Sequence, residues 1–335
     1  MVGENRIGEP FSQGDDRKPN TLQEHEREPK TNAIAFAFPD LLGSESDLCS
    51  SERIRRVESP HLSPVVQHIR PLLESIDGEC AVAVRSLEAS SEEVLLDADV
   101  EFHAASTMKV PVMVELYRQA ANGQFSLDDS IRVENEFRSI VDESPYALDP
   151  ADDSYDALYE HLGDRRSIRT LMRVMITASS NLATNLLLEM VGPEKVTRTM
   201  HRLGAEGLQV RRGVEDLKAF RKSRNNTTTA HGLLVLFEHI ARGTAVSEEA
   251  SAEMINILKE QEHTEMIPAR LPDTVEVAHK TGWITGVRHD AGIVFVPEGP
   301  TYVLVLLSRN LSDVPAGVET LSRISRVVYD AQRGS

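Results

Sequence analysis

The chain has 335 residues, more than one small core requires, which favours two domains or one domain with a tail. Its 53 Asp and Glu residues outnumber 36 Lys and Arg residues, giving a net charge of -17 at pH 7 that repels phosphate backbones and excludes nucleic acid as an expected partner. No run approaches the roughly 18 consecutive apolar residues of a membrane-spanning helix, so we expect no membrane span.

Residues 1–62 are rich in charged residues, Ser and Pro, and we predict a disordered acidic and polar tail. The apolar stretch at 33–38 is either a cluster without a role or a segment that docks on a partner or on the folded domain. No secretory signal is visible, so the cytoplasm is the default compartment. Cys49 and Cys80 can form at most one disulfide and fit no metal-ligand spacing.

A globular domain is predicted for residues 63–335. Apolar residues at helical spacing over 65–76 precede two short strands at 80–87 and 93–97, which are predicted to form a hairpin. A last amphipathic helix is predicted at 316–332. Between these ends, helices are predicted at 108–121, 167–177, 181–190, 194–203, 228–241 and 248–260, and strands at 274–281, 291–296 and 302–308.

This order predicts an α/β fold of the α+β kind: an antiparallel sheet built from both chain ends, flanked by terminal helices, with an inserted all-helical lobe. The sheet lobe is expected to comprise 63–105 and 271–335, and the helical lobe 106–270. An active site is expected in the cleft between the lobes. The acidic segment 138–165 is expected to be a solvated loop, or alternatively a mobile rim over that cleft.

The first chemical motif is Ser106-Thr-Met-Lys109, at a junction of strand and helix. The three-residue spacing places both side chains on one helix face, where the lysine amine can reach the hydroxyl. A lysine whose pKa is lowered by burial can act as base for a serine nucleophile. Alternatively, Ser106 is a helix N-cap and Lys109 a surface residue.

The second motif, Ser179-Ser-Asn181, stands at the predicted start of a central helix. Ser179 supplies a hydroxyl for proton relay, and the Asn181 amide can bond a substrate amide. Alternatively, Ser179 or Ser180 only caps the helix.

The third motif, Lys280-Thr281-Gly282-Trp283, stands at the end of a late strand. Lys280 and Thr281 would hold a substrate carboxylate, and Gly282 permits close approach of the backbone. The backbone N–H groups of Trp283 and Ser106 would form an oxyanion hole. The indole of Trp283 would narrow the cleft or simply cover the sheet.

In this order and context, the three motifs resemble those of the serine β-lactamase and penicillin-binding superfamily, and most closely the class A β-lactamases. The resemblance covers about residues 65–332. It implies a serine hydrolase that opens β-lactam amide bonds, acting as a monomer on a small-molecule substrate with no metal or organic cofactor. Members of that family are usually periplasmic or secreted, in contrast to the default compartment above.

The resemblance also implies roles for individual residues. The implied catalytic residues are Ser106, Lys109, Ser179 and Glu215, and the implied substrate-binding residues are Asn181, Asn185, Lys280, Thr281, Gly282 and Trp283. Ser106 forms the acyl-enzyme with Lys109 as base partner, and Ser179 shuttles the proton. Glu215 activates the water that releases the acyl group, and Asn185 would help to hold Glu215.

Departures from the family pattern concern deacylation. Ser180 stands where class A enzymes usually have an aspartate, so a loop-stabilising carboxylate is expected to be missing. The loop after Glu215 also lacks the asparagine that helps to position water. Asp216 is an alternative base, and Glu215 is alternatively a loop carboxylate paired with Arg211 or Arg212.

Two other functions remain open on the same motifs. One is a D-alanyl-D-alanine peptidase or esterase, which would tolerate the altered loop. The other is a penicillin-binding sensor that is acylated without turnover and docks a partner through its tail. Arg288 is either a second positive charge for the substrate carboxylate or part of a structural salt bridge.

Overall fold

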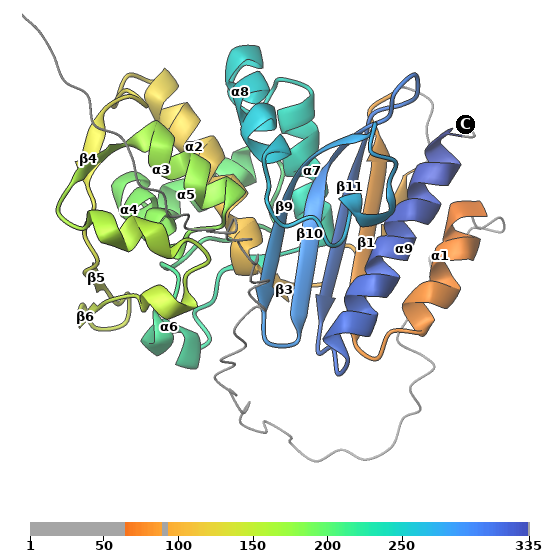
Figure 1. Cartoon of the computed structure of the whole chain (residues 1–335), viewed down its shortest axis with the longest axis horizontal. Helices are drawn as coiled ribbons and strands as arrows, with labels where there is room; N and C mark the ends of the chain where they lie inside the picture. The colour runs from red at the N-terminus through yellow and green to blue at the C-terminus, as the bar shows by residue number, and fades with distance from the viewer. Residues whose placement is uncertain (1–63, 89–92, 334–335) are drawn as a thin grey trace, which may run out of the picture. The chain divides into compact units, whose positions relative to one another are not determined.

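The computed structural model describes residues 64–88 and 93–333 (Figure 1). The tail predicted at 1–62, with Cys49, lies outside these residues. The helices are α1 Pro64–Glu74, α2 Lys109–Ala121, α3 Ile168–Thr177, α4 Asn181–Val191, α5 Pro193–Arg202, α6 Leu217–Arg221, α7 Ala230–Ala241, α8 Glu248–Lys259 and α9 Val314–Arg333. None of the helices in the described ranges is both long enough and apolar enough to cross a membrane.

Five strands form the main sheet, in the order β2-β1-β11-β10-β9. These strands are β1 Glu79–Ser86, β2 Val94–Leu96, β9 Glu276–Ile284, β10 Val287–Phe295 and β11 Tyr302–Arg309, and the short strands elsewhere are β3 Phe102–His103, β4 Ser130–Arg132, β5 Phe137–Arg138, β6 Pro145–Tyr146, β7 Arg165–Ser167 and β8 Thr227–Thr228. Strand β1 pairs antiparallel with β11, from Glu79 opposite Arg309 to Ser86 opposite Tyr302. The predicted antiparallel sheet from both chain ends is therefore confirmed, and so is the β1–β2 hairpin.

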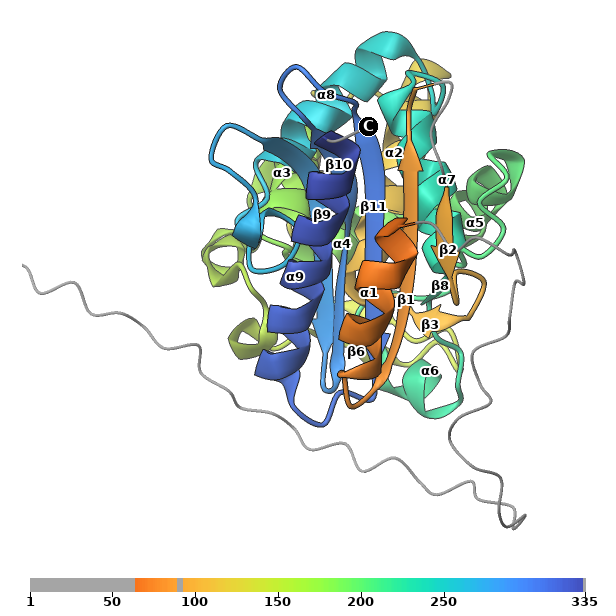
Figure 2. The same cartoon turned by 90° about the vertical axis from the view of Figure 1, so that its right-hand side faces the viewer.

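Both faces of the sheet are covered by helices, so the central strand β11 is apolar from Tyr302 to Leu307. Helices α1 and α9 lie side by side over one face, as Figure 2 shows, while α7 packs on the opposite face. Successive strand residues alternate between these two layers. The layer under α1 and α9 contains Ile69, Val82, Val84, Leu304, Leu306, Leu321, Ile324 and Val328. The layer under α7 contains Ala81, Ala83, Leu233, Phe237, Val303 and Val305.

The expectation of a solvated loop for the acidic segment 138–165 is wrong for a large part of its length. It contains strand β6 and the two 3₁₀ turns Pro150–Asp152 and Asp156–His161. Leu148 and Leu158 are buried in the core of the helical part of the molecule. The segment is folded because these leucines bury apolar area, and the second 3₁₀ turn packs on α4.

Strand β9 forms one edge of the main sheet. It packs against the 3₁₀ turn Ala105–Met108 and against α8. The three sequence motifs are brought together along this edge.

Candidate active site

Ser106 lies on the 3₁₀ turn Ala105–Met108, directly before α2 begins at Lys109. The turn is pressed against β9, because an ideal Cβ built on Gly282 would lie 2.9 Å from the backbone nitrogen of Ser106. Only a residue without a side chain permits this approach. Ala105 has a φ of 45°, a left-handed conformation that is strained for alanine. Ser106 therefore sits half-buried on a strained corner between strand and helix.

Two histidines, the partly buried His103 and the buried His289, hold this corner in place, and sequence reasoning identified neither. The Ala105 N–H donates to His103 Nδ1 at 3.0 Å, and His289 Nε2 donates to the backbone oxygen of His103 at 2.8 Å. Burial lowers the pKa of both histidines to about 4, with the Arg212 charge adding to the effect on His103. Both rings are therefore neutral at pH 7, and for His103 the accepting Nδ1 requires it.

Lys109 is fully buried, so the alternative of a surface lysine is wrong. Its amine donates to the Ser179 backbone oxygen at 2.6 Å, to Ser179 Oγ at 3.1 Å and to Asn181 Oδ1 at 3.0 Å. Among the described residues these are its acceptors, and the hydroxyl of Ser106 is not one of them. Burial lowers the pKa of Lys109 to about 7, against the opposing negative charges of Asp153 and Glu215. The amine is therefore able to take up or release a proton near neutral pH.

The Ser179 hydroxyl lies between two buried amines. Lys109 Nζ and Lys280 Nζ each donate to Ser179 Oγ at 3.1 Å. Burial and the nearby charge of Lys109 lower the pKa of Lys280. Ser179 itself has a φ of 60°, and it is Ser180 that caps α4, by accepting from the Ala183 N–H at 3.2 Å. A hydroxyl between two amines of lowered pKa can pass a proton from one side of the site to the other.

Glu215 reaches the same site from the loop before α6. Asn181 Nδ2 donates to Glu215 Oε1 at 3.0 Å. The Asn185 amide accepts from the Val214 N–H at 2.6 Å and donates to the Val214 oxygen at 3.0 Å, so Asn185 holds the residue before Glu215. Burial raises the pKa of Glu215 to about 7, although its hydrogen bond to Asn181 opposes the shift; the negative charges of Asp152 and Asp153 raise it further. A carboxyl group with this pKa is suited to accept a proton at neutral pH.

The two alternatives raised for this loop are not supported by the contacts. The carboxylate of Asp216 accepts from Ser139 Oγ at 2.8 Å, from Ile140 N at 2.9 Å and from Ala219 N at 3.0 Å. Asp216 is thus the N-cap of α6 and links it to residues 139–140, and both of its oxygens are engaged in these bonds. Within the described residues, Glu215 forms no ion pair with either arginine that precedes it.

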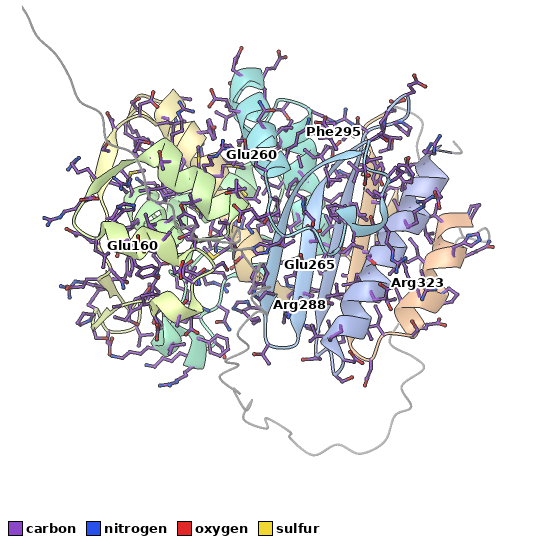
Figure 3. The ribbon with its side chains drawn as sticks, in the orientation of Figure 1. Glu160, Glu260, Glu265, Arg288, Phe295 and Arg323 are labelled. Carbon is purple, nitrogen blue, oxygen red and sulfur yellow. The ribbon has the colours of Figure 1, made fainter. Side chains whose placement is uncertain are left out.

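Arg288 stands opposite Trp283 of the third motif in the pairing of β9 with β10. Its Nη1 donates to the backbone oxygens of Ile284 at 3.1 Å and Val287 at 2.8 Å. Together with Glu265 and Val318 it lines a hollow beside α9, and Figure 3 labels both charged residues near the sheet. Within the described residues Arg288 forms no salt bridge, and its role as a second positive charge for the substrate carboxylate stays a prediction.

Polar atoms without a partner surround Lys280. Within the described residues, Thr281 Oγ1 and His263 Nε2 are both buried and make no hydrogen bond. The His263 ring meets Trp283 edge-on, with 4.6 Å between the ring centroids. Burial lowers the pKa of His263, and the charges of Lys280 and Lys109 add to this. Unsatisfied buried polar atoms beside an amine are where a substrate anion would be received. His263 lies in a connection that carries no motif, so nothing in the sequence singled it out.

The carboxylate expected to be missing because of Ser180 is present, but it comes from another segment. Asp153, from the acidic segment 138–165, lies buried at the start of α4 and accepts from the N–H groups of Asn181 and Leu182. Nothing in the sequence distinguished Asp153 from the other acids around it. No group of three or more His, Cys, Asp or Glu residues that could hold a metal ion occurs in the described part of the chain.

Comparison with known proteins agrees with this geometry. Residues 64–332 match the family model described as the beta-lactamase enzyme family. The chain belongs to this family. It is a member of the serine β-lactamase and penicillin-binding superfamily, as the three motifs predicted.

Individual members of the β-lactamase family are only distantly similar. A β-lactamase of Bacillus licheniformis is 27% identical over 53% of this chain and 60% of its own length, so the chain spans less than two thirds of that relative. A solved β-lactamase of Sphaerobacter thermophilus is 25% identical, covers 80% of this chain and 96% of its own, and superimposes with a TM-score of 0.67. The solved protein PBP-A is also 25% identical, covers 81% and 96%, and has a TM-score of 0.69. A variant of PBP-A was solved as an acyl-enzyme complex with penicillin G.

Proposed function

We propose that this protein is a serine hydrolase of the class A β-lactamase type, which opens β-lactam amide bonds through an acyl-enzyme on Ser106. The observation that carries the proposal is the placement of Ser179 Oγ at 3.1 Å from both Lys109 Nζ and Lys280 Nζ, beside a nucleophile turn packed on β9. Acyl transfer to a serine needs a base, a proton path to the leaving nitrogen and an anion seat, and these groups supply all three.

Acylation begins when Ser106 Oγ attacks the lactam carbonyl carbon. In the proposed step the neutral Lys109 amine takes the hydroxyl proton, directly or through a water. The substrate carboxylate sits at Lys280 and Thr281, whose Oγ1 is buried without a partner in the described residues. The lactam C–N bond then breaks, and the nitrogen receives its proton through the Ser179 hydroxyl. The product is an ester on Ser106 with the ring opened.

Deacylation requires a water molecule that attacks this ester. Glu215 takes a proton from the water, the Ser106–acyl bond breaks, and Ser106 leaves with a proton returned to its oxygen. Support for this role comes from the Glu215 carboxylate, which is held by Asn181 and whose pKa burial raises to about 7. General base catalysis of this kind contributes about 100- to 10,000-fold to a rate.

A second candidate is a penicillin-binding peptidase or sensor that is acylated and hydrolyses its acyl-enzyme slowly. One specific observation favours it: α6 begins two residues after Glu215 with Leu217 and Lys218, so the loop offers no asparagine to position the water. PBP-A, a protein of the same fold, is similar to this chain at 25% identity.

The deciding experiment is a time course with a chromogenic cephalosporin, followed by intact-mass analysis of the same sample. Sustained turnover without lasting mass gain, abolished in Ser106→Ala, is the result expected for the lactamase. A stoichiometric mass gain that maps to Ser106, without turnover, would instead favour the penicillin-binding peptidase or sensor. If neither turnover nor a mass gain is observed, the lactamase and the penicillin-binding function are both rejected.

The chain before residue 63 is not part of the proposed chemistry. A shortened protein that begins at residue 61 should keep the turnover of the full chain. Loss of partner binding with unchanged turnover in the shortened protein would instead assign an interaction role to the removed segment.

A further inference from the structure

Asp153 connects the acidic segment 138–165 to the turn that carries Ser179. Its side chain is buried although it is ionisable. Both carboxylate oxygens lie 3.0 Å from the Asn181 backbone nitrogen, and Oδ2 lies 2.8 Å from the backbone nitrogen of Leu182. The N–H groups in the first turn of a helix have no acceptor within the helix. Asp153 therefore satisfies two donors that α4 cannot satisfy itself.

The same carboxylate accepts bonds from side chains on either side of it. Tyr159 OH donates to Oδ2 at 3.1 Å, and Ser180 Oγ donates to it at 3.4 Å. The Tyr155 N–H donates to Oδ1 at 3.0 Å, which folds the segment around its own carboxylate. With this many donors Asp153 has little freedom to move, and the residues beside Ser179 are fixed with it.

The turn needs such support because its backbone is strained. Ser179 has a φ of 60°, a left-handed conformation that serine rarely adopts. It persists when its surroundings over-determine it. The Ser180 N–H bonds to the Val174 oxygen at 3.1 Å on one side, and the Asp153 bonds to Asn181 hold the other side.

The charge of Asp153 also acts on the two groups proposed to move protons. The titratable groups that face it are Lys109 on α2, Glu215 on the loop before α6, and Tyr159 on its own segment. Burial dominates the pKa of both Lys109 and Glu215, and the negative charge of Asp153 raises each of them. Removing that charge should therefore lower the pKa of both groups.

We propose that Asp153 is a positioning residue for the acyl transfer: through the start of α4 it holds Ser179 and Asn181 in place, supplying from the acidic segment 138–165 the carboxylate that Ser180 lacks. The inference rests on the proposed function for its consequence in catalysis, while the holding of α4 stands on the hydrogen bonds alone.

The first arm of the test measures the backbone without any substrate. Amide hydrogen exchange of Asn181 and Leu182 is followed in the full chain, in Asp153→Ala and in the matched control Glu160→Gln. Glu160 is an exposed acid of the same segment and is labelled in Figure 3. The expected result is exchange at least about tenfold faster in Asp153→Ala and unchanged in the control. Unchanged exchange in Asp153→Ala would overturn the proposal.

The second arm measures acylation of Ser106 by intact mass, with the folded fraction of each variant established by thermal unfolding. Acylation should fall about 10- to 100-fold in Asp153→Ala and not in Glu160→Gln. The double variant Asp153→Ala, Ser180→Asp places a carboxylate back at the start of α4 and should recover at least about tenfold of the loss. Faster exchange with normal acylation would overturn the catalytic role of Asp153.

A third measurement, the pH profile of deacylation in Asp153→Asn, separates positioning from simple destabilisation. Asp153→Asn keeps the size of the side chain and one acceptor oxygen, so the fold should be retained. Because the substitution removes the negative charge that raises the pKa of Glu215, the pH profile for deacylation should move to lower pH. An unshifted profile would show that the charge of Asp153 does not reach Glu215. If the unmodified chain is not acylated at all, the proposed function fails, and the exchange arm still decides whether Asp153 holds α4.

Discussion

Lowering the pH from 7 to 5.5 should slow release of the acyl group from Ser106 about 15-fold. The base must be ionised to take a proton from water, and burial raises the pKa of Glu215 to about 7. A group with that pKa is about half ionised at pH 7 and about 3% ionised at pH 5.5. A glutamate with an ordinary pKa near 4.3 would stay more than about 90% ionised, and the rate would change by less than roughly 10%.

The assay isolates deacylation from the steps before it. The acyl-enzyme is formed in a short pulse, transferred to buffers between pH 5 and 8, quenched in acid and quantified by intact mass. Because the acyl bond is already present, titration of Lys109 during acylation does not affect the result. Glu215→Gln is the matched control, since it keeps the size of the side chain and an acceptor for Asn181 but removes the base. It should slow deacylation about 100- to 10,000-fold and leave a residual rate that does not depend on Glu215 ionisation.

Two results would refute this reasoning at different points. A deacylation rate that is constant from pH 5.5 to 7, with Glu215→Gln still inactive, would mean that Glu215 is the base but that its pKa is not raised. Deacylation of Glu215→Gln at the rate of the unmodified chain would mean that another group activates the water.

Three further predictions concern the surroundings of the site. Gly282→Ala places a Cβ 2.9 Å from the Ser106 nitrogen, so the nucleophile turn must shift, and acylation measured by intact mass should fall about 100-fold. Asn185→Ala removes both hydrogen bonds to Val214, so pulse measurements should show deacylation slowed about tenfold or more, with a smaller effect on acylation. Burial lowers the pKa of His289 to about 4 in the fold, so the unfolded chain binds a proton more readily than the folded chain. The free energy of unfolding should therefore be unaffected by His289 above pH 6.5 and should fall by up to about 1.4 kcal/mol per pH unit as the pH drops from 6.5 towards 4. Urea unfolding at pH 7, 6 and 5 will measure this fall.

Each of these predictions can fail visibly. Normal acylation in Gly282→Ala would show that the turn tolerates the added carbon. Equal losses in both steps for Asn185→Ala would mean that Asn185 does not act through the loop of the proposed base. His289→Gln should flatten the fall in stability below pH 6.5, and a slope equal to that of the unmodified chain would assign the fall to other groups.

The main helices and strands were predictable because their periodicity is local. The helix predicted at 181–190 is observed as α4 Asn181–Val191, and the one predicted at 248–260 as α8 Glu248–Lys259. The segment 138–165 was not predictable in the same way. Its two buried leucines are separated by acids at no regular period, so composition indicated a solvated loop.

What the sequence by itself determined is the set of chemical groups and their local geometry. The spacing of Ser106 and Lys109 keeps the two residues close to each other in the chain, with Ser106 on the short turn that leads into the helix and Lys109 at its first position. The order of the motifs predicted the superfamily, and the order of the strand-like and helical segments predicted the sheet made from both chain ends. These conclusions depend on covalent spacing and on patterns that a single segment contains.

Only the tertiary structure decided how those groups behave as acids and bases. Lys109 is far in sequence from Ser179 and from Glu215, and the three meet because α2, α4 and the loop before α6 pack together. Asp153 reaches the start of α4 across a similar gap. Burial and the distance to other charges set a pKa, and both arise when remote segments come into contact, so no pattern along the chain contains them.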